Sequence, residues 1–344
     1  MRRVVAIEFK RFSVANQYSI VKNSPVAGVP PAVPLLKFII RKSVQGVLLL
    51  FVVSAISFAL LSRAGGDAFS SLRDNPQISA ETIESLRETY GLDRPAAARY
   101  LNWLGDALRG DMGESFSFRT PVRGLVLGRL WNTLQIGGLG LLFAVGLSAL
   151  LAFLSVRHPG RVVRRVNEAV VLLAASTPRI VLSLAALLLA VTLARRGAAI
   201  APGSWSLLLL ASVVLGSPLV AIFLAQMQEG LRGAMREPFV QFARAKGLSE
   251  TAVILRHASR AALNPVLSLL GMSLGSIVGG SVIVETVLGW PGVGALMVGA
   301  IRGRDVPLVM GIVVLASAAV WFGNAAAELL QMLNDKRMRE AEEN

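Results

Sequence analysis

The sequence contains no cysteine and only two histidines among its 344 residues. The lack of cysteine excludes disulfides, thiol nucleophiles and thiolate metal sites. His158 and His257 lie in separate basic segments without carboxylates at metal-ligand spacing, which favours two surface histidines. No lysine has the upstream glycines and the following Ser or Thr of a Walker phosphate loop. We therefore expect neither an enzyme nor a cofactor, and any energy from ATP must come from another chain.

Acidic residues are also scarce, with 21 Asp and Glu against 35 Lys and Arg, so the formal net charge is +14. A basic balance can indicate nucleic-acid binding, but membrane topology explains it better, because cytoplasmic loops are enriched in Lys and Arg. If the N-terminus is cytoplasmic, all six lysines fall on that side: Lys10, Lys22, Lys37, Lys42, Lys246 and Lys336. We therefore expect cytoplasmic N- and C-termini, contact with membrane lipid and no nucleic-acid partner.

Hydrophobic residues are abundant, at 54% of the chain. A helix needs roughly 20 apolar residues to cross the hydrocarbon layer of a bilayer. Five runs meet this length, and a sixth is interrupted by Pro178 and Arg179. The five are Val44 to Leu61, Thr133 to Val156, Ser206 to Ala225, Val266 to Val284 and Leu308 to Leu330, and the sixth is Ala169 to Leu193. The sequence predicts an all-α integral membrane protein with six spans.

The parts between and around the spans divide the chain further. Residues 1–34 form a basic, cytosolic N-terminal extension, residues 35–339 the transmembrane domain, and residues 340–344 a cytosolic tail. After the first span, an outer segment (residues 62–131) is electrically neutral and carries two helical patterns. One begins after Ser79, a favourable N-cap, and the other runs from Pro95 to about Arg109. We expect these two helices to cover the outer mouth of the bundle.

A polar and basic loop at residues 229–264 separates the fourth and fifth spans. Its centre retains helix-forming sequence that is broken by Gly247, a residue that tolerates the backbone of a tight turn. Ser249 is placed to cap a second short helix, with Glu250 and Thr251 in its first turn. Two short helices with a basic face, held between two spans, are typical of a docking element rather than a catalytic site.

Three motifs in this chain resemble one family of transporters. The stretch ARAKGL at residues 243–248, followed by HASRAALNP at 257–265, is similar to the EAA loop of ABC-importer permeases in its dipeptide, oligopeptide and nickel form. ETVLGWPGVG at 285–294, followed by RDVPLV at 304–309, resembles a second family segment. YGLDRP at 90–95 and GDMGES at 110–115 resemble the family's outer pattern. Together the resemblance covers about residues 36–339.

The resemblance implies a fold, a function and a set of partners. The fold is a six-span ABC-importer permease (MetI-like) bundle with an outer two-helix insertion, in the bacterial inner membrane. The function is to form the pathway for peptides or similar small solutes. The partners are a second permease subunit of different sequence, two cytosolic ATPase subunits and an extracytoplasmic solute-binding protein. The residues that would couple the permease to the ATPase subunits are Phe242, Ala243, Arg244, Ala245, Lys246, Gly247, Leu248 and Ser249.

Pro178 and Arg179 are candidate pathway residues. A charge near the middle of a bilayer costs about 2.5–3.5 kcal/mol on insertion scales, so Arg179 should face a polar cavity or a partner. Pro178 leaves a backbone carbonyl free in its helix. Arg179 could meet a solute carboxylate or a peptide carbonyl. Pairing with an acid of the partner permease, or with a freed carbonyl, is an equal alternative.

Two other classes of protein are weighed against an ABC permease. A secondary transporter or channel would work without an ATPase, and a coupled carrier should place ion-binding carboxylates inside its spans. Glu168, Glu285 and Glu328 lie only near span ends. An intramembrane enzyme would need a nucleophile, metal or acid–base constellation, and the sequence offers none.

Overall fold

The computed structural model describes residues 32–63, 79–89, 91 and 93–334. The regular elements of the described part are all helices, with no strand and one isolated bridge between Glu114 and Pro121. The helices are α1 (Ala32–Arg63), α2 (Ala80–Thr89), α3 (Ala96–Leu108), α4 (Val122–Arg157), α5 (Arg161–Ser176), α6 (Arg179–Arg195), α7 (Trp205–Ala234), α8 (Pro238–Ala245), α9 (Glu250–Val253), the π-helix η4 (Ile254–Ala258), α10 (Ser259–Ala261), α11 (Leu263–Leu288), α12 (Val293–Arg302) and α13 (Val306–Asn334). The expected extension (1–34) lies outside the described residues except for its last three, and the tail (340–344) lies wholly outside them.

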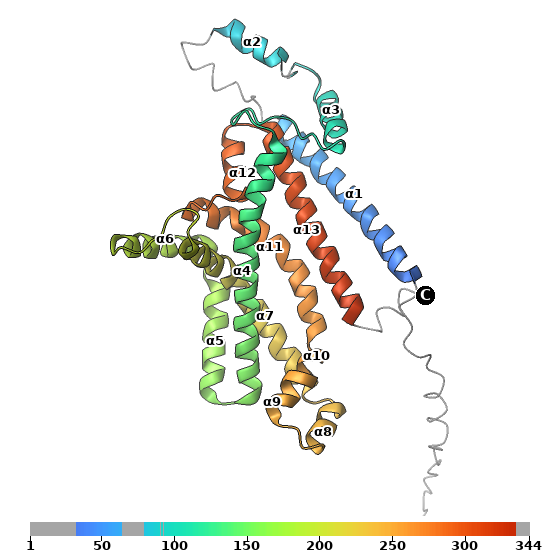
Figure 1. Ribbon diagram of the computed structural model, residues 1–344, viewed down its shortest axis with the longest axis vertical. Helices are drawn as coiled ribbons and strands as arrows, with labels where there is room; N and C mark the ends of the chain where they lie inside the picture. The colour runs from blue at the N-terminus through green and yellow to red at the C-terminus, as the bar shows by residue number, and fades with distance from the viewer. Residues whose placement is uncertain (1–31, 64–78, 90, 92, 335–344) are drawn as a thin grey trace, which may run out of the picture.

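Five helices in the described part are long and apolar enough to cross a membrane: α1, α4, α7, α11 and α13. The interrupted run predicted as a sixth span forms two helices, α5 and α6, bent by 100° at Thr177 and Pro178. Proline removes a backbone donor and disfavours helical geometry in the residue before it, which explains the break at this point. Figure 1 shows α5 running beside α4, while α6 leaves the bundle sideways.

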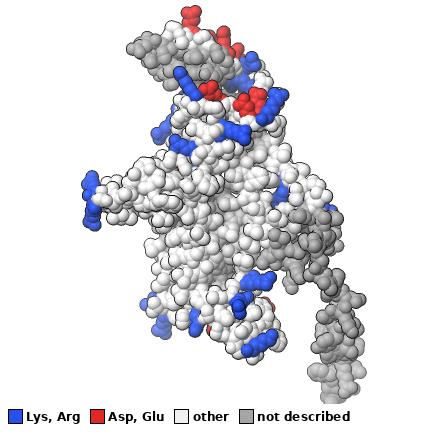
Figure 2. Space-filling model, in the orientation of Figure 1, with Lys and Arg blue, Asp and Glu red and all other residues white. Residues whose placement is uncertain are grey.

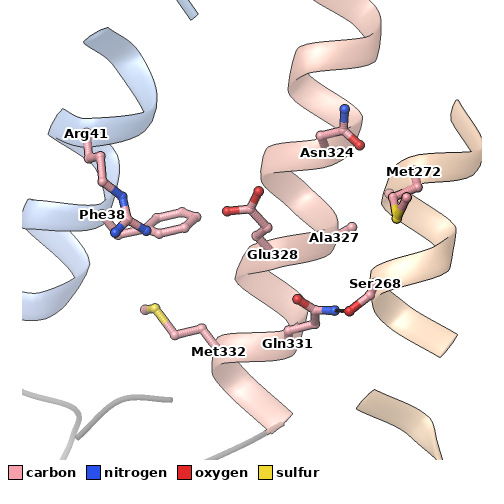
Figure 3. A pocket seen from close by; sticks show the side chains of 10 residues that line it. Phe38, Arg41, Ser268, Met272, Asn324, Ala327, Glu328, Gln331 and Met332 are labelled. Atoms are coloured by element: carbon pink, nitrogen blue, oxygen red, sulfur yellow. Dashed lines mark hydrogen bonds between the residues drawn. The ribbon is translucent and has the colours of Figure 1, made fainter. Parts of the chain in front are cut away.

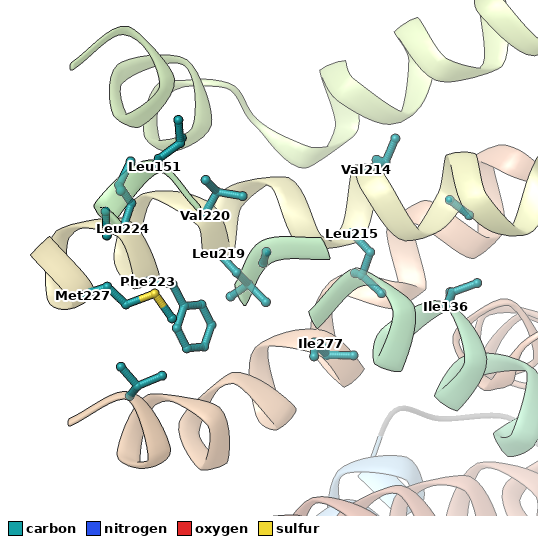
Figure 4. Packing of buried hydrophobic residues seen from close by; sticks show 14 of the residues in the cluster. Ile136, Leu151, Val214, Leu215, Leu219, Val220, Phe223, Leu224, Met227 and Ile277 are labelled. Atoms are coloured by element: carbon teal, nitrogen blue, oxygen red, sulfur yellow. The ribbon is translucent and has the colours of Figure 1, made fainter. Parts of the chain in front are cut away.

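Helix α7 is the centre of the bundle and packs chiefly against α4. In the most apolar 18-residue stretch of α7, 67% of the residues are buried, against 17% in the corresponding stretch of α1. The helices meet closely where Gly140 faces Gly216, since a Cβ on Gly140 would lie 2.7 Å from the Ser212 carbonyl oxygen. Small residues at a crossing let two backbones approach within a membrane. Figure 4 shows the apolar layer around this contact, with Leu215, Leu219 and Phe223 of α7 at its centre.

Helix α3 of the outer segment packs on the first span. The Tyr100 ring lies 5.4 Å from the Phe58 ring and its hydroxyl lies 3.0 Å from Ser54 Oγ. Leu101 and Leu108 of the same helix are exposed. At the start of α2, Ser79 Oγ accepts a hydrogen bond from the Thr82 amide.

Charged side chains lie mainly at the two ends of the bundle, and the band between them is largely uncharged apart from the basic tip of α6 (Figure 2). We call the end with α2, α3 and α12 the outer end, and the end with α8, α9 and η4 the inner end (Figure 1). The coupling loop predicted from the sequence therefore lies wholly at one end. Helix α7 continues to Ala234, so the irregular part of that loop begins later than residue 229.

Candidate functional site

The turn centred on Gly247 ends α8 in a defined way. Gly247 has a φ of 77°, in the left-handed region that favours glycine, and nothing lies within 4 Å of its missing Cβ. The Gly247 amide donates to the Arg244 carbonyl (2.9 Å) and the Leu248 amide to the Ala243 carbonyl (3.4 Å). This pair of bonds is a Schellman motif, which satisfies the last carbonyls of a helix. Gly247 is therefore required for backbone conformation rather than for close packing.

The segment after the turn is fixed by a cap and an ion pair. Ser249 is the N-cap of α9, where its side chain accepts from the Ala252 amide (3.4 Å). Arg244 spans the turn to Glu250 with two contacts, Nη2 to Oε1 at 2.6 Å and Nε to Oε2 at 3.1 Å. These hydrogen bonds hold the pKa of the Glu250 carboxyl below its usual range. The pair ties α8 to α9 and fixes the angle between them.

Apolar side chains of α8 and of the turn after it divide into a buried set and an exposed set. Val240 and Ala243 are buried (0% and 4% exposed) and pack with Val253 in a small cluster. Phe242, by contrast, is 70% exposed and Leu248 is 37% exposed. We call Phe242 and Leu248 the apolar pair. Exposed aromatic and aliphatic side chains at a water-facing end commonly mark a protein interaction site.

The other predicted coupling residues surround this pair. Ala245 and Lys246 are exposed, and Lys246 is the C-cap of α8. The chain then continues through α9, η4 and α10 into α11, and both η4 and α10 contact α7. π-Helical turns are rare and are frequent at functional sites. The structure thus brings all eight predicted coupling residues into one short unit that is continuous with two spans.

The candidate pathway residues lie at the break between α5 and α6. Pro178 is the N-cap of α6. Arg179 Nη2 donates to Ser276 Oγ of α11 at 2.7 Å, and the guanidinium lies over Gly280, where a Cβ would overlap it. Arg179 Nε has no hydrogen-bond partner among the described residues. The residue is therefore bound to a hydroxyl of its own chain and keeps a donor that the described part of the chain does not satisfy.

The structure also shows a polar clamp at the outer end, built around the motif ETVLGWPGVG at residues 285–294. Glu285 of α11 is fully buried. Its Oε1 accepts from Thr133 Oγ1 (2.6 Å) and its Oε2 from the Ala295 amide (3.0 Å). Thr133 Oγ1 also accepts from the Val293 amide (2.9 Å). A Cβ on Gly292 would overlap the Glu285 carboxylate, which explains the glycine there. We call Thr133, Glu285 and the start of α12 the outer clamp.

A second buried carboxylate joins two of the sequence motifs. Asp305 caps α13 by accepting from the Leu308 amide at 3.2 Å. Its other oxygen accepts from Ser115 Oγ (2.6 Å) and the Ser117 amide (2.9 Å). The motifs GDMGES and RDVPLV are therefore in direct contact. The contact joins Ser115 and Asp305, which lie 190 positions apart in the sequence. The only sequence signal for this contact was the shared family resemblance of the two motifs.

A cavity of about 360 Å³ lies between α1, α11 and α13. Figure 3 shows Arg41 and Phe38 of α1 facing Glu328 of α13, with Gln331 donating to Ser268 Oγ. Glu328 also pairs with Lys42 at 2.5 Å. Glu285 and Glu328 are thus each engaged by side chains of the same chain.

Comparison with known proteins identifies relatives of both parts of the chain. Residues 144–340 match the family described as "Binding-protein-dependent transport system inner membrane component", and residues 35–136 match the N-terminal component of the same kind of transport system. The chain is 30% identical over 314 residues to the oligopeptide transport system permease protein AppB of Bacillus subtilis, covering 88% of this chain and 98% of that one. It is 28% identical over 298 residues to the glutathione transport system permease protein GsiC of Escherichia coli K12, covering 86% and 96%.

Proposed function

Because the chain belongs to the family of binding-protein-dependent transport system inner membrane components, we propose that its α8–α9 unit is the docking element for a cytosolic ATPase. The protein is a permease subunit of an ATP-driven importer, and ATP is hydrolysed on separate chains. A channel or carrier that works without an ATPase is not supported by these relatives. The docking role of particular residues is our proposal.

The observation that carries the proposal is the exposed apolar pair. Phe242 and Leu248 project from a unit whose other apolar face is already used for packing inside the chain. Lys246, which lies between them in the sequence, adds exposed positive charge. An apolar anchor with a charged rim is the usual anatomy of a protein–protein contact, in which charges orient the partner and apolar anchors supply most of the affinity.

The α8–α9 unit is rigid, so it would transmit the movement of a docked ATPase to the spans. The Schellman turn, the Ser249 cap and the Arg244–Glu250 pair hold α8 and α9 at a fixed angle. Helix α7 ends shortly before the unit, and the chain leads from the unit through η4 and α10 into α11. A rigid-body shift of a docked ATPase would therefore displace α7 and α11 together. Helix α11 also carries the Ser276 contact to Arg179 and, at its far end, Glu285.

The family supplies the coarser setting, a multi-pass inner-membrane protein that works with a binding protein. The proposed assembly pairs this chain with a second permease of different sequence and adds two ATPase subunits and an extracytoplasmic solute-binding protein. We place the inner end and both termini in the cytoplasm, because the lysines and the coupling loop lie on that side. The solute class is peptides or small peptide-like molecules, in line with the names of AppB and GsiC.

Co-purification tests the docking role. Phe242→Ala combined with Leu248→Ala should reduce the amount of ATPase that co-purifies with the permease by at least about tenfold, since two anchors of a hot spot are removed. Leu108→Ala is the matched control, because Leu108 is 81% exposed but lies on α3 at the outer end. Undiminished ATPase recovery with the double variant would refute the proposed docking surface.

We also assign Arg179 to the solute pathway, at the elbow formed with Pro178. Its unsatisfied Nε suits a carbonyl or carboxylate of a peptide-like solute. Arg179→Gln keeps a donor for Ser276 but removes the charge, and it should lower uptake of anionic solutes more than uptake of neutral ones. Arg195→Gln, at the exposed end of α6, is the control. Equal uptake of both solute types by Arg179→Gln and the unaltered protein would rule the pathway role out.

A further inference from the structure

The tip of α6 carries positive charge at a level where the rest of the bundle has almost none. Arg195 is the last residue of α6 and Arg196 is its C-cap. Because α6 is bent by 100° from α5, it leaves the bundle sideways instead of continuing to the outer end (Figure 1). Its basic tip therefore lies beside the largely uncharged band (Figure 2). Both arginines are exposed, and no acidic side chain of the described residues pairs with them.

The chain that follows this tip is irregular. Residues 197–204 join α6 to α7 without a helix, and they include Gly197 and Gly203 in the left-handed region, at φ of 91° and 84°. Irregular backbone at membrane depth occurs where protein covers it or where water fills a cavity beside it, and not against acyl chains. A guanidinium group in hydrocarbon is unfavourable for the same reason. The tip and its loop therefore need protein or water around them.

The exposed side of α6 is apolar all the way to the tip. Four large side chains, each at least 43% exposed, follow one another at spacings of three or four residues: Ile180, Leu184, Leu188 and Val191. Arg195 continues the same stripe at the next such spacing. The buried residues of α6, by contrast, are small: Ser183, Ala186 and Ala190. Water would leave the stripe unburied and acyl chains would leave the arginines unpaired, whereas an apolar protein groove that ends at a carboxylate satisfies both.

The depth of α6 indicates which protein supplies this groove. In the proposed assembly, the ATPase subunits and the solute-binding protein meet the two ends of the bundle, so the second permease is the partner that lies beside α6 within the membrane. A second copy of this chain would not supply the carboxylate. The described spans contain four acids: Glu168, Glu229, Glu285 and Glu328. Glu285 is buried in the outer clamp and Glu328 pairs with Lys42. Glu168 and Glu229 lie in the inner halves of α5 and α7, away from the level of the tip.

We propose that α6 is the element by which this chain contacts the second permease. Its apolar stripe lies in a groove of that subunit, and Arg195 and Arg196 meet a carboxylate of one of that subunit's spans. The inference rests on the proposed function, in which two permeases form the pore. Because the acid comes from the partner, the pore pairs two different sequences rather than two copies of this one. The contact also positions the Pro178–Arg179 elbow, since α6 begins there.

Co-purification through a tag on the second permease tests the charged part of the contact. Arg195→Gln combined with Arg196→Gln should lower the recovery of this chain by at least about tenfold, because a buried carboxylate of the partner is left without its counter-charge. Arg164→Gln combined with Arg165→Gln is the matched control, since these neighbouring exposed arginines lie towards the inner end of α5. Recovery of the control should equal that of the unaltered chain. Equal recovery of the α6 double variant would overturn the proposal.

Photo-crosslinking identifies what covers the stripe. With p-benzoylphenylalanine in place of Leu188, irradiation of the assembled importer should give an adduct with the second permease. An adduct with another copy of this chain, or no protein adduct, would overturn the proposal, because a second copy, lipid or water would then cover α6.

Recovery of the ATPase on a tag of this chain is measured separately. It should persist in the α6 double variant, and its loss with the second permease retained would count against docking alone. The single variant Arg195→Gln keeps Arg196, and any weaker pairing lowers uptake of anionic and neutral solutes alike, unlike the change expected at Arg179.

Discussion

The two ends of this permease are stabilised by different kinds of polar contact. At the outer end, Glu285 and Asp305 are fully buried, and each binds groups that lie far away in the sequence. At the inner end, the Arg244–Glu250 pair is partly exposed and joins residues only six positions apart. The outer end is thus fixed by long-range buried hydrogen bonds, whereas the inner unit is fixed by local capping and leaves its apolar pair free. A rigid outer end and a self-contained inner unit suit a subunit that is moved by an ATPase docked at its inner end.

The largest effect should come from breaking the outer clamp. Glu285→Ala leaves Thr133 Oγ1 and the Ala295 amide buried without their acceptor, so it should cost about 3 kcal/mol of stability. Thermal unfolding of the purified complex measures this loss. Glu168→Ala is the control, since the Glu168 side chain is 67% exposed. Similar unfolding temperatures for both variants would contradict a structural role for Glu285.

A smaller effect should come from filling the space beside the clamp. Gly292→Ala places a methyl group against the Glu285 carboxylate and should destabilise the protein by about 2 kcal/mol through overpacking. Gly299→Ala lies within α12, the helix that Gly292 precedes, where nothing is within 4 Å of the new methyl group, and it should be neutral or slightly stabilising. Chemical or thermal unfolding of the two variants compares them directly. The comparison fails if Gly299→Ala is the more damaging change.

At the inner end, Gly247→Ala should have a moderate and local effect. The methyl group has room, but a left-handed φ costs a non-glycine residue about 1–2 kcal/mol. We expect lower transport per ATP hydrolysed with little change in unfolding temperature, because the strain falls on the turn between α8 and α9. Uptake and ATPase activity are measured together in proteoliposomes. An unchanged amount of solute transported per ATP would show that coupling does not depend on the angle of this turn.

The smallest effect on stability should come from the exposed ion pair. A double-mutant cycle of Arg244→Ala and Glu250→Ala should give a coupling energy of about 0.5 kcal/mol, as for other exposed pairs. Because Arg244 lowers the pKa of Glu250, the pair contributes fully above the unfolded pKa of about 4.3 and is lost as the pH falls through the lower folded value. The same cycle repeated well below that pH should give no coupling energy.

Local features of the sequence predicted the inner unit well. Gly247 and Ser249 act through their own backbone and the next few residues, so their roles as turn residue and N-cap followed from residue type and spacing. The five uninterrupted spans followed from length and hydropathy in the same way. Pro178 marked the interruption of the sixth run, but the 100° bend depends on how α6 packs against α11 and α7.

The outer clamp could not be derived in this way. Thr133 and Glu285 are 152 residues apart, and no local rule relates them. A glutamate near a span end is equally typical of a surface position, and its burial depends on the start of α12 folding back over it. Ser115 and Asp305 present the same difficulty. Long-range polar contacts require the three-dimensional packing of the bundle, whereas capping and turn residues do not.

Site-directed crosslinking is the most direct test of the docking surface. Because the chain has no cysteine, Leu248→Cys gives this subunit a single thiol at the apolar pair, and Ile301→Cys gives it a single thiol at the outer end, where Ile301 is 54% exposed. A short thiol-to-amine crosslinker applied to the assembled importer should join the ATPase to Leu248→Cys and not to Ile301→Cys. An ATPase adduct that forms with Ile301→Cys, or none with Leu248→Cys, would contradict the account.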